Sequence, residues 1–143
     1  GAEDGAPEVE GHPVEGSLSH TLAPDGTPLA LAAAGAVPLG VDIEALKPRR
    51  PDLYRFLLHP DEYPLLGTLA DRHGEPPEVA VVRCWAMKEA VLKALRTGFR
   101  LSPKKLRLAV NGEGAFAEAE GTRWRLHTAD LHGCTAALAV PAS

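Results

Sequence analysis

The chain has 143 residues, 45% of them hydrophobic and 24% charged, which is enough for one packed core and too little for two ordinary domains. No apolar run approaches the ~20 residues of a membrane helix and the acidic start lacks the regions of a signal peptide, so we expect a soluble chain. Two cysteines without paired spacing favour a reducing compartment, so we expect a cytoplasmic protein. A net charge of -4 and 5% aromatic residues disfavour nucleic-acid binding.

The first residues are rich in Gly, Pro and Glu and have little to bury. Residues 1–15 therefore predict a disordered acidic lead or linker, followed by a single domain over residues 16–143. The next segment, SLSHT at 17–21, reads as a polar turn ahead of the first strand. In that turn Ser19 and His20 offer a hydroxyl and an imidazole that suit a phosphate oxygen, and the alternative is an ordinary surface pair.

Apolar residues then follow a turn-forming cluster, APDGTP. The stretch 28–44 is broken near Gly35, which suggests a hairpin between its two halves. Prolines at positions typical of a first helical turn predict two short helices over 51–58 and 60–70.

A long helix is the clearest element of the sequence. It is predicted to start after Pro76 and Pro77, to run through EVAVVRCWAMKEAVLKAL at 78–95 and to stop at Gly98. Trp85, Glu89 and Lys93 recur at four-residue steps and share one face, beside a stripe of residues that we expect to be buried. That stripe consists of Ala80, Cys84, Met87, Val91 and Leu95.

The tail alternates as strands do. Turns at Asn111, Gly121 and Gly133 separate four such segments and predict an antiparallel meander. Because the helices are grouped between strands, we expect an α+β fold in which the long helix packs on an antiparallel sheet.

Two carboxylates mark the segment GVDIE at 40–44. Asp42 and Glu44 stand two apart in a predicted strand, so both point to one face while Val41 and Ile43 point into the core. Two like charges held together suit a cation, and oxygen ligands without a nearby Cys or His cluster favour Mg²⁺. A solvated pair on an edge strand is the alternative.

Glu89 lies on the long helix between two cations, Lys88 and Lys93. It offers a third oxygen ligand or a base, next to positive charge for a phosphate. An ordinary helical ion pair is the alternative.

Basic residues concentrate between Arg83 and Arg107, a distribution that suits an anionic partner, and a solvated face is the alternative. Cys84 and Cys134 have no paired spacing, so we expect buried free thiols.

In chain order, four segments resemble motifs of the phosphopantetheinyl transferase superfamily: SLSHT at 17–21, GVDIE at 40–44, FLLHPDEY at 56–63 and WAMKEAVLKALRTGF at 85–99. The resemblance spans about residues 17–110, and the closing CTAALAVP is similar to the last strands of surfactin-type members. It implies Mg²⁺-dependent transfer of 4'-phosphopantetheine from coenzyme A to a serine of an acyl or peptidyl carrier protein.

The resemblance also implies residue roles. Asp42, Glu44 and Glu89 would hold Mg²⁺ on the pyrophosphate of coenzyme A. Glu89 and Lys93 would be catalytic, Glu89 as the base for the carrier serine and Lys93 as the cation on the attacked phosphate.

Ser19, His20, Lys88 and Lys93 would contact the coenzyme. Glu62 matches the family's acid in the preceding helix, where it would either reach the metal or support the site. The basic residues after the long helix would face the acidic carrier: Arg96, Arg100, Lys104 and Lys105.

Surfactin-type members contain two similar halves, whereas this chain resembles one half plus the last hairpin of the other. We therefore expect a half-fold that self-associates, with a homotrimer favoured. The order of the motifs resembles surfactin-type enzymes, and the short chain resembles transferase regions of enediyne polyketide synthases, which implies polyketide or fatty acid biosynthesis. The alternative is a catalytically weak remnant that binds coenzyme A or a carrier protein in a structural role.

Overall fold

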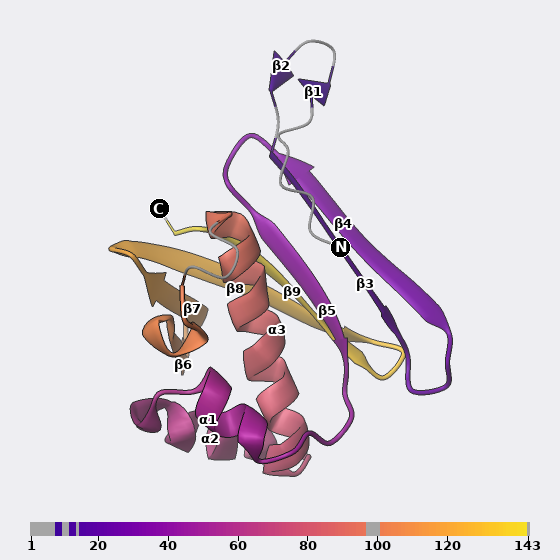
Figure 1. The fold of residues 1–143 in the computed structure, drawn as a ribbon, viewed down its shortest axis with the longest axis vertical. Helices are drawn as coiled ribbons and strands as arrows, with labels where there is room; N and C mark the ends of the chain where they lie inside the picture. Colours follow the sequence, from indigo (N-terminus) through magenta and orange to yellow (C-terminus); the bar gives the residue numbers. More distant parts are fainter. Residues whose placement is uncertain (1–7, 10–11, 14, 97–100, 143) are drawn as a thin grey trace.

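The structure is a computed structural model that describes residues 8–9, 12–13, 15–96 and 101–142. It has the expected α+β architecture, in which the long helix α3 packs on a five-stranded antiparallel sheet (Figure 1). In chain order the elements are β1 (Glu8–Val9), β2 (His12–Pro13), β3 (Glu15–Leu22), β4 (Pro28–Gly35), β5 (Gly40–Ala45), α1 (Asp52–Leu57), η1 (Pro60–Glu62), α2 (Tyr63–His73), α3 (Pro77–Leu95), η3 (Pro103–Lys105), β6 (Arg107–Asn111), β7 (Gly114–Ala119), β8 (Thr122–Leu131) and β9 (Cys134–Pro141).

The C-terminal half of the sheet is the meander predicted from the alternating tail. The strand order is β5, β9, β8, β7, β6, and all pairs are antiparallel. Strand β5 joins this meander at the edge, where Asp42 lies opposite Ala137 of β9. The carboxylate segment therefore forms a strand, as predicted, and this strand lies at the edge of the sheet.

The N-terminal strands correct two predictions. Residues 15–22 form β3, which pairs along its whole length with β4, so SLSHT is a strand and not a turn. The hairpin expected around Gly35 is wrong, because β4 pairs with β3 while β5 pairs with β9. The turn of the real hairpin is the cluster APDGT at 23–27, where Thr27 N donates to Asp25 Oδ1 at 2.9 Å.

Strand β3 lies beside β5 without forming a backbone ladder with it. Instead, the Ser17 hydroxyl accepts a hydrogen bond from Val41 N at 3.0 Å, and the Ser19 hydroxyl accepts one from Ile43 N at 3.2 Å. Backbone donors left unpaired in a buried edge would cost stability. Two side-chain hydroxyls thus take the place of a neighbouring strand along this edge.

The helices follow the sequence rules closely. The two predicted short helices appear as α1 and as η1 continued by α2, and α3 begins at Pro77. Helix α3 ends at Leu95, where Arg96 adopts the left-handed conformation (φ 54°) that we expected of a later glycine. The predicted stop, Gly98, lies outside the described residues.

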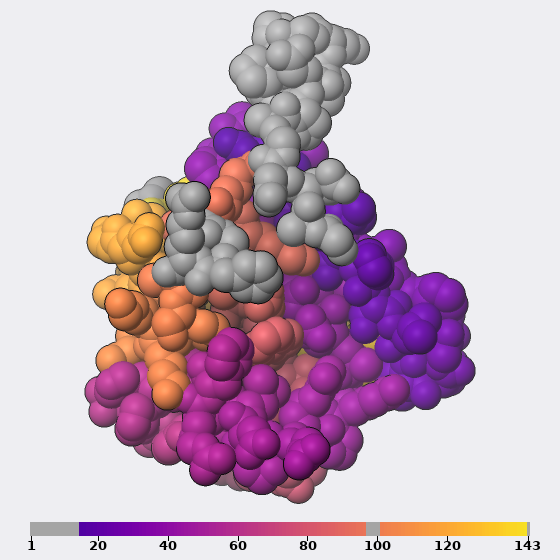
Figure 2. All heavy atoms as spheres, viewed as in Figure 1, coloured from indigo at the N-terminus to yellow at the C-terminus, as the bar shows by residue number. Residues whose placement is uncertain are grey.

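Helix α3 forms the centre of the main core. Twelve of its 19 residues are buried, because the sheet covers one side and α1 and α2 pack near its start (Figure 1). In Figure 2 the atoms of the magenta segment that holds α1 and α2 form the base of the molecule. A smaller cluster on the opposite face of the sheet joins Ile43 to Leu29 and Leu31 of β4. Both cysteines are buried free thiols, as predicted.

The predicted acidic lead, residues 1–15, lies largely outside the described residues. Within it, Glu8–Val9 pairs with His12–Pro13, and Glu15 already belongs to β3. Among the described residues, no helix is both long and apolar enough to cross a membrane.

Candidate functional site

Strand β5 approaches α3 so closely that Gly40 is required. A Cβ atom at this position would lie 2.0 Å from the carbonyl oxygen of Ala90 and 2.5 Å from the backbone nitrogen of Ala94. Real Cβ contacts are never this short, so only glycine allows the backbones to meet. Because alternate residues share a face, Asp42 and Glu44 point toward α3 together with Gly40.

The facing side of α3 carries the three residues predicted from their four-residue spacing. Trp85, Glu89 and Lys93 are only half-buried, whereas the residues around them on the helix are buried. The more accessible second face is therefore confirmed, and so is the buried stripe except at Leu95, which is only partly buried. The two carboxylates of strand β5 therefore face the Glu89 carboxylate and the Lys93 ammonium group of helix α3.

The Asp42 carboxylate is buried, with 4% of the residue exposed, and its two oxygens have different surroundings. Oδ1 accepts a hydrogen bond from the Ser19 hydroxyl at 3.1 Å and lies 3.4 Å from Lys93 Nζ. Among the described residues, Oδ2 has no hydrogen-bond partner. Burial, together with the neighbouring Glu44 carboxylate, raises the pKa of Asp42 to about 9.

Glu44 and Glu89 complete the acidic group. The Glu44 side chain is 21% exposed and lies 3.8 Å from the Arg49 guanidinium. Burial raises the pKa of Glu89, Lys93 opposes this shift, and Glu44 adds to it. Within the part of the chain that the structure describes, no three His, Cys, Asp or Glu side chains form a ready metal cage.

Lys88, expected to contact the coenzyme, lies in the interior with 0% of the residue exposed. Its ammonium donates to Glu62 Oε1 at 2.7 Å and to the carbonyl oxygens of Leu57 and Pro103 at 2.9 Å each. These three bonds use all the donors of an ammonium group. The structure therefore gives Lys88 no path to a ligand, and we do not retain its expected coenzyme contact.

Glu62 is the partner that fixes Lys88. Besides the ion pair, its Oε1 accepts from His59 N at 3.0 Å and its Oε2 accepts from Leu108 N at 3.0 Å. Glu62 is itself buried, so these bonds hold its carboxylate between Lys88, His59 and Leu108.

The predicted pair Ser19 and His20 does not act as a pair in the structure. Successive residues of β3 point to opposite faces, so Ser19 is buried against Asp42 while His20 is exposed. In the predicted turn, by contrast, both side chains would contact the same phosphate.

The expected basic patch is also divided. Arg83 is buried between Glu75 and Asp130, with hydrogen bonds of 2.8–2.9 Å to both. Arg96 donates to Glu15 at 2.7 Å. Lys104 and Lys105 are exposed, and Arg100 lies outside the described residues.

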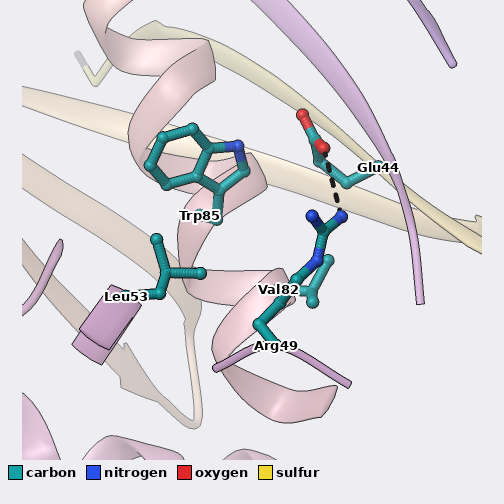
Figure 3. A pocket seen from close by; sticks show the side chains of 5 residues that line it. All are labelled: Glu44, Arg49, Leu53, Val82 and Trp85. Carbon is teal, nitrogen blue, oxygen red and sulfur yellow. Dashed lines mark ion pairs between the residues drawn. The ribbon is translucent and has the colours of Figure 1, made fainter. Parts of the chain in front are cut away.

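An open pocket of about 340 Å³ adjoins the acidic group, and the sequence analysis did not predict it. Glu44, Arg49, Leu53, Val82 and Trp85 line it (Figure 3). Arg49 and Leu53 come from the segment leading into α1 and from α1 itself, so only the fold brings them to Trp85. Their spacing in the sequence gave no signal for this.

The comparisons with solved structures support the fold. The chain is similar to holo-[acyl-carrier-protein] synthases from Thermotoga maritima (TM-score 0.59, 19% identity), Neisseria meningitidis (0.58, 20%) and Plasmodium yoelii (0.52, 18%). The similarity covers 73%, 74% and 73% of this chain and 62%, 98% and 93% of those chains, respectively. This chain thus spans about three fifths of the Thermotoga chain.

No curated protein sequence matches the chain. A family model described as the 4'-phosphopantetheinyl transferase superfamily matches residues 38–140, which include β5 and α3 but not β3. Since this match covers well over half of the sequence, the chain belongs to the 4'-phosphopantetheinyl transferase superfamily.

Proposed function

We propose that this chain transfers 4'-phosphopantetheine from coenzyme A to a serine of an acyl or peptidyl carrier protein, with Mg²⁺. The observation that carries the proposal is the close packing of β5 on α3 at Gly40, which brings Asp42 and Glu44 to the face of Glu89 and Lys93. Family membership and the fold support it.

The carboxylates fit a divalent cation. Among the described residues, Asp42 has a buried oxygen without a hydrogen-bond partner, and the Glu44 carboxylate lies near enough to raise the pKa values of both Asp42 and Glu89. Mg²⁺ in enzymes is usually held by one or two carboxylates together with water and substrate phosphates, so a complete protein cage is not needed. Asp42, Glu44 and Glu89 are the proposed ligands.

The chemistry that we propose is a phosphoryl transfer. When bound, Mg²⁺ supplies positive charge that offsets the charge on the phosphate oxygens during attack. Glu89 takes the proton of the carrier serine, directly or through water, and its raised pKa makes it a stronger base. The serine oxygen bonds to the phosphorus that carries pantetheine, and adenosine bisphosphate leaves with the electrons of the broken phosphorus–oxygen bond.

Lys93 is the proposed cation on the attacked phosphate. Its side chain is 20% exposed and lies beside Asp42, so the ammonium can turn to a ligand while it stays in the site. His20 is retained as a proposed contact for the phosphates of coenzyme A, because it is exposed next to Ser19. Lys104 and Lys105 are the proposed contacts for an acidic carrier.

Other expectations also stay proposals. They are a transferase domain over residues 16–143, a homotrimeric assembly, and a relationship to surfactin-type enzymes, in which SLSHT precedes GVDIE. Origin in a polyketide synthase of the enediyne kind, or in fatty acid biosynthesis, rests on the motif order and length.

The test is the mass of an apo carrier protein after incubation with the chain, coenzyme A and Mg²⁺. We expect a phosphopantetheine adduct with the wild type and none with Glu89→Gln, which removes the base and one ligand charge. The matched control is Glu78→Gln, an exposed position in the first turn of the same helix, which should react as the wild type does.

Two results would overturn the proposal. A folded wild type that binds coenzyme A or the carrier without forming any adduct would instead support the binding remnant. Adduct formation by Glu89→Gln within a few-fold of the wild-type rate would remove Glu89 from the mechanism.

A further inference from the structure

We infer that Ser19 is a positioning residue that orients the Asp42 carboxylate so that Oδ2 faces the metal. This inference rests on the proposed function, and it assigns Ser19 a role different from the coenzyme contact expected from the sequence. It is carried by the hydrogen bonds around one buried hydroxyl.

The direction of each hydrogen bond at Ser19 is fixed by its partners. Ile43 N can only donate, so the hydroxyl oxygen accepts that bond at 3.2 Å. The single hydroxyl proton is then left for Asp42 Oδ1, at 3.1 Å. With 4% of the residue exposed, Ser19 has little access to water as another acceptor.

A second donor acts on the same oxygen. Lys93 Nζ lies 3.4 Å from Asp42 Oδ1 and 3.3 Å from the carbonyl oxygen of Leu18. Both donors therefore converge on Oδ1, while Oδ2 is buried without a partner among the described residues. A carboxylate held by one oxygen in this way directs its other oxygen, and the orientation of a ligand is commonly fixed by such neighbours.

Ser17 provides an internal comparison on the same strand. It lies on the same face of β3, and its hydroxyl also accepts a bond from a backbone donor of β5, Val41 N at 3.0 Å. Unlike Ser19, it makes no hydrogen bond to a carboxylate among the described residues. Both serines thus cap the edge of β5, and only Ser19 adds a bond to the acidic group.

The experiment measures Mn²⁺ affinity of the full chain, with saturating coenzyme A, from the electron paramagnetic resonance signal of free Mn²⁺. We expect Ser19→Ala to weaken Mn²⁺ binding about tenfold or more, as losses of ligand-orienting partners typically do. Ser17→Ala should bind Mn²⁺ within about twofold of the wild type, although both variants lose one hydrogen bond to the backbone of β5. Ser19→Thr, which keeps the hydroxyl, should restore affinity.

If Ser19→Ala does not fold, Ser19→Cys replaces it in the experiment. The cysteine side chain keeps about the volume of serine, but its thiol is only a weak hydrogen-bond donor to Asp42. Equal Mn²⁺ affinity in the Ser17 and Ser19 variants would overturn the inference, as would a raised KM for coenzyme A with unchanged Mn²⁺ affinity in Ser19→Ala. A wild type that binds no Mn²⁺ would also overturn it.

Failure of the proposed function would look different. A wild type that binds Mn²⁺ but forms no carrier adduct would refute transfer, while the contrast between the two serine variants would still stand.

Discussion

Adjacent residues of α3, Lys88 and Glu89, have opposite environments. Lys88 is buried with three internal acceptors, while Glu89 lies on the accessible face toward β5. Burial lowers the pKa of Lys88, and its ion pair with Glu62 opposes that shift. The pair therefore anchors the segments after α1 and before β6 to helix α3.

Replacing Lys88 tests this structural role. Lys88→Met keeps the length of the side chain but leaves the Glu62 carboxylate buried without its cation, and breaking such a pair typically costs about 3–5 kcal/mol. We expect urea unfolding to show a loss of this size. Lys105→Met, at an exposed position, should change the free energy of unfolding by less than about 0.5 kcal/mol. A Lys88→Met protein of wild-type stability would contradict the structural role.

For single residues, the sequence predicted which side chains share a face of a helix or strand, but it did not predict all of their hydrogen-bond partners. The helical period placed Glu89 and Lys93 on one face, and alternation placed Asp42 and Glu44 on one face. The bond between Ser19 and Asp42 joins residues 23 positions apart, and no local pattern encodes it. The burial of Lys88 likewise depends on Glu62, Leu57 and Pro103, which only the fold brings together.

At the scale of elements, the contact between β5 and α3 depends on Gly40. Gly40→Ala would drive a methyl group into the backbone of Ala90 and Ala94, which cannot move aside as a flexible side chain would. We expect a loss of about 3 kcal/mol or more in the free energy of unfolding, at the upper end for overpacking. The control is Gly67→Ala in α2, where an added Cβ meets nothing within 4 Å and should stabilise the helix. Equal stabilities of the two variants would contradict the close approach.

A second contact between elements, from Arg83 of α3 to Asp130 of β8, leads us to expect that stability depends on pH. Hydrogen bonds from Arg83 lower the pKa of Asp130 below its ordinary value of 3.8, so the ionised form is favoured in the folded chain. The contribution of Asp130 is thus complete above that ordinary pKa and is lost as the pH falls below it. We expect the free energy of unfolding to fall below about pH 4, and to fall less steeply in Asp130→Asn. The control Asp71→Asn, at an exposed position, should show the same dependence of the free energy of unfolding on pH as the wild type. If Asp130→Asn also showed the wild-type dependence, the ion pair between Arg83 and Asp130 would not be its cause.

Elements with strong periodicity were predicted correctly, and the errors share a physical cause. Ser and His favour turns when considered alone, so SLSHT was assigned to a turn. It is a strand because its hydroxyls satisfy the backbone donors of β5, a tertiary contact that overrides local preference. The long helix, in contrast, ends at Leu95 as the sequence predicts, and the guanidinium of the following residue, Arg96, bonds to Glu15 of β3.

At the scale of the whole molecule, the proposed site is bordered by β3, β5 and α3, and Glu44 and Lys93 remain about one fifth exposed. We therefore expect a second copy to complete the cleft, and sedimentation at micromolar concentration should show a homotrimer. Activity measured across the same concentrations should follow the fraction of trimer. A monomer with full activity would show that one chain closes the site by itself.

If β5 and α3 together hold the metal of a transferase site, the ion must lie between these two elements, and its location can be measured. Anomalous scattering from Mn²⁺, in crystals grown with coenzyme A, would show that position. We predict a peak within about 2.0–2.2 Å of Asp42 Oδ2, with Glu44 or Glu89 as a further ligand. A bound coenzyme with its Mn²⁺ held by other residues, or with no Mn²⁺ at these carboxylates, would contradict the account.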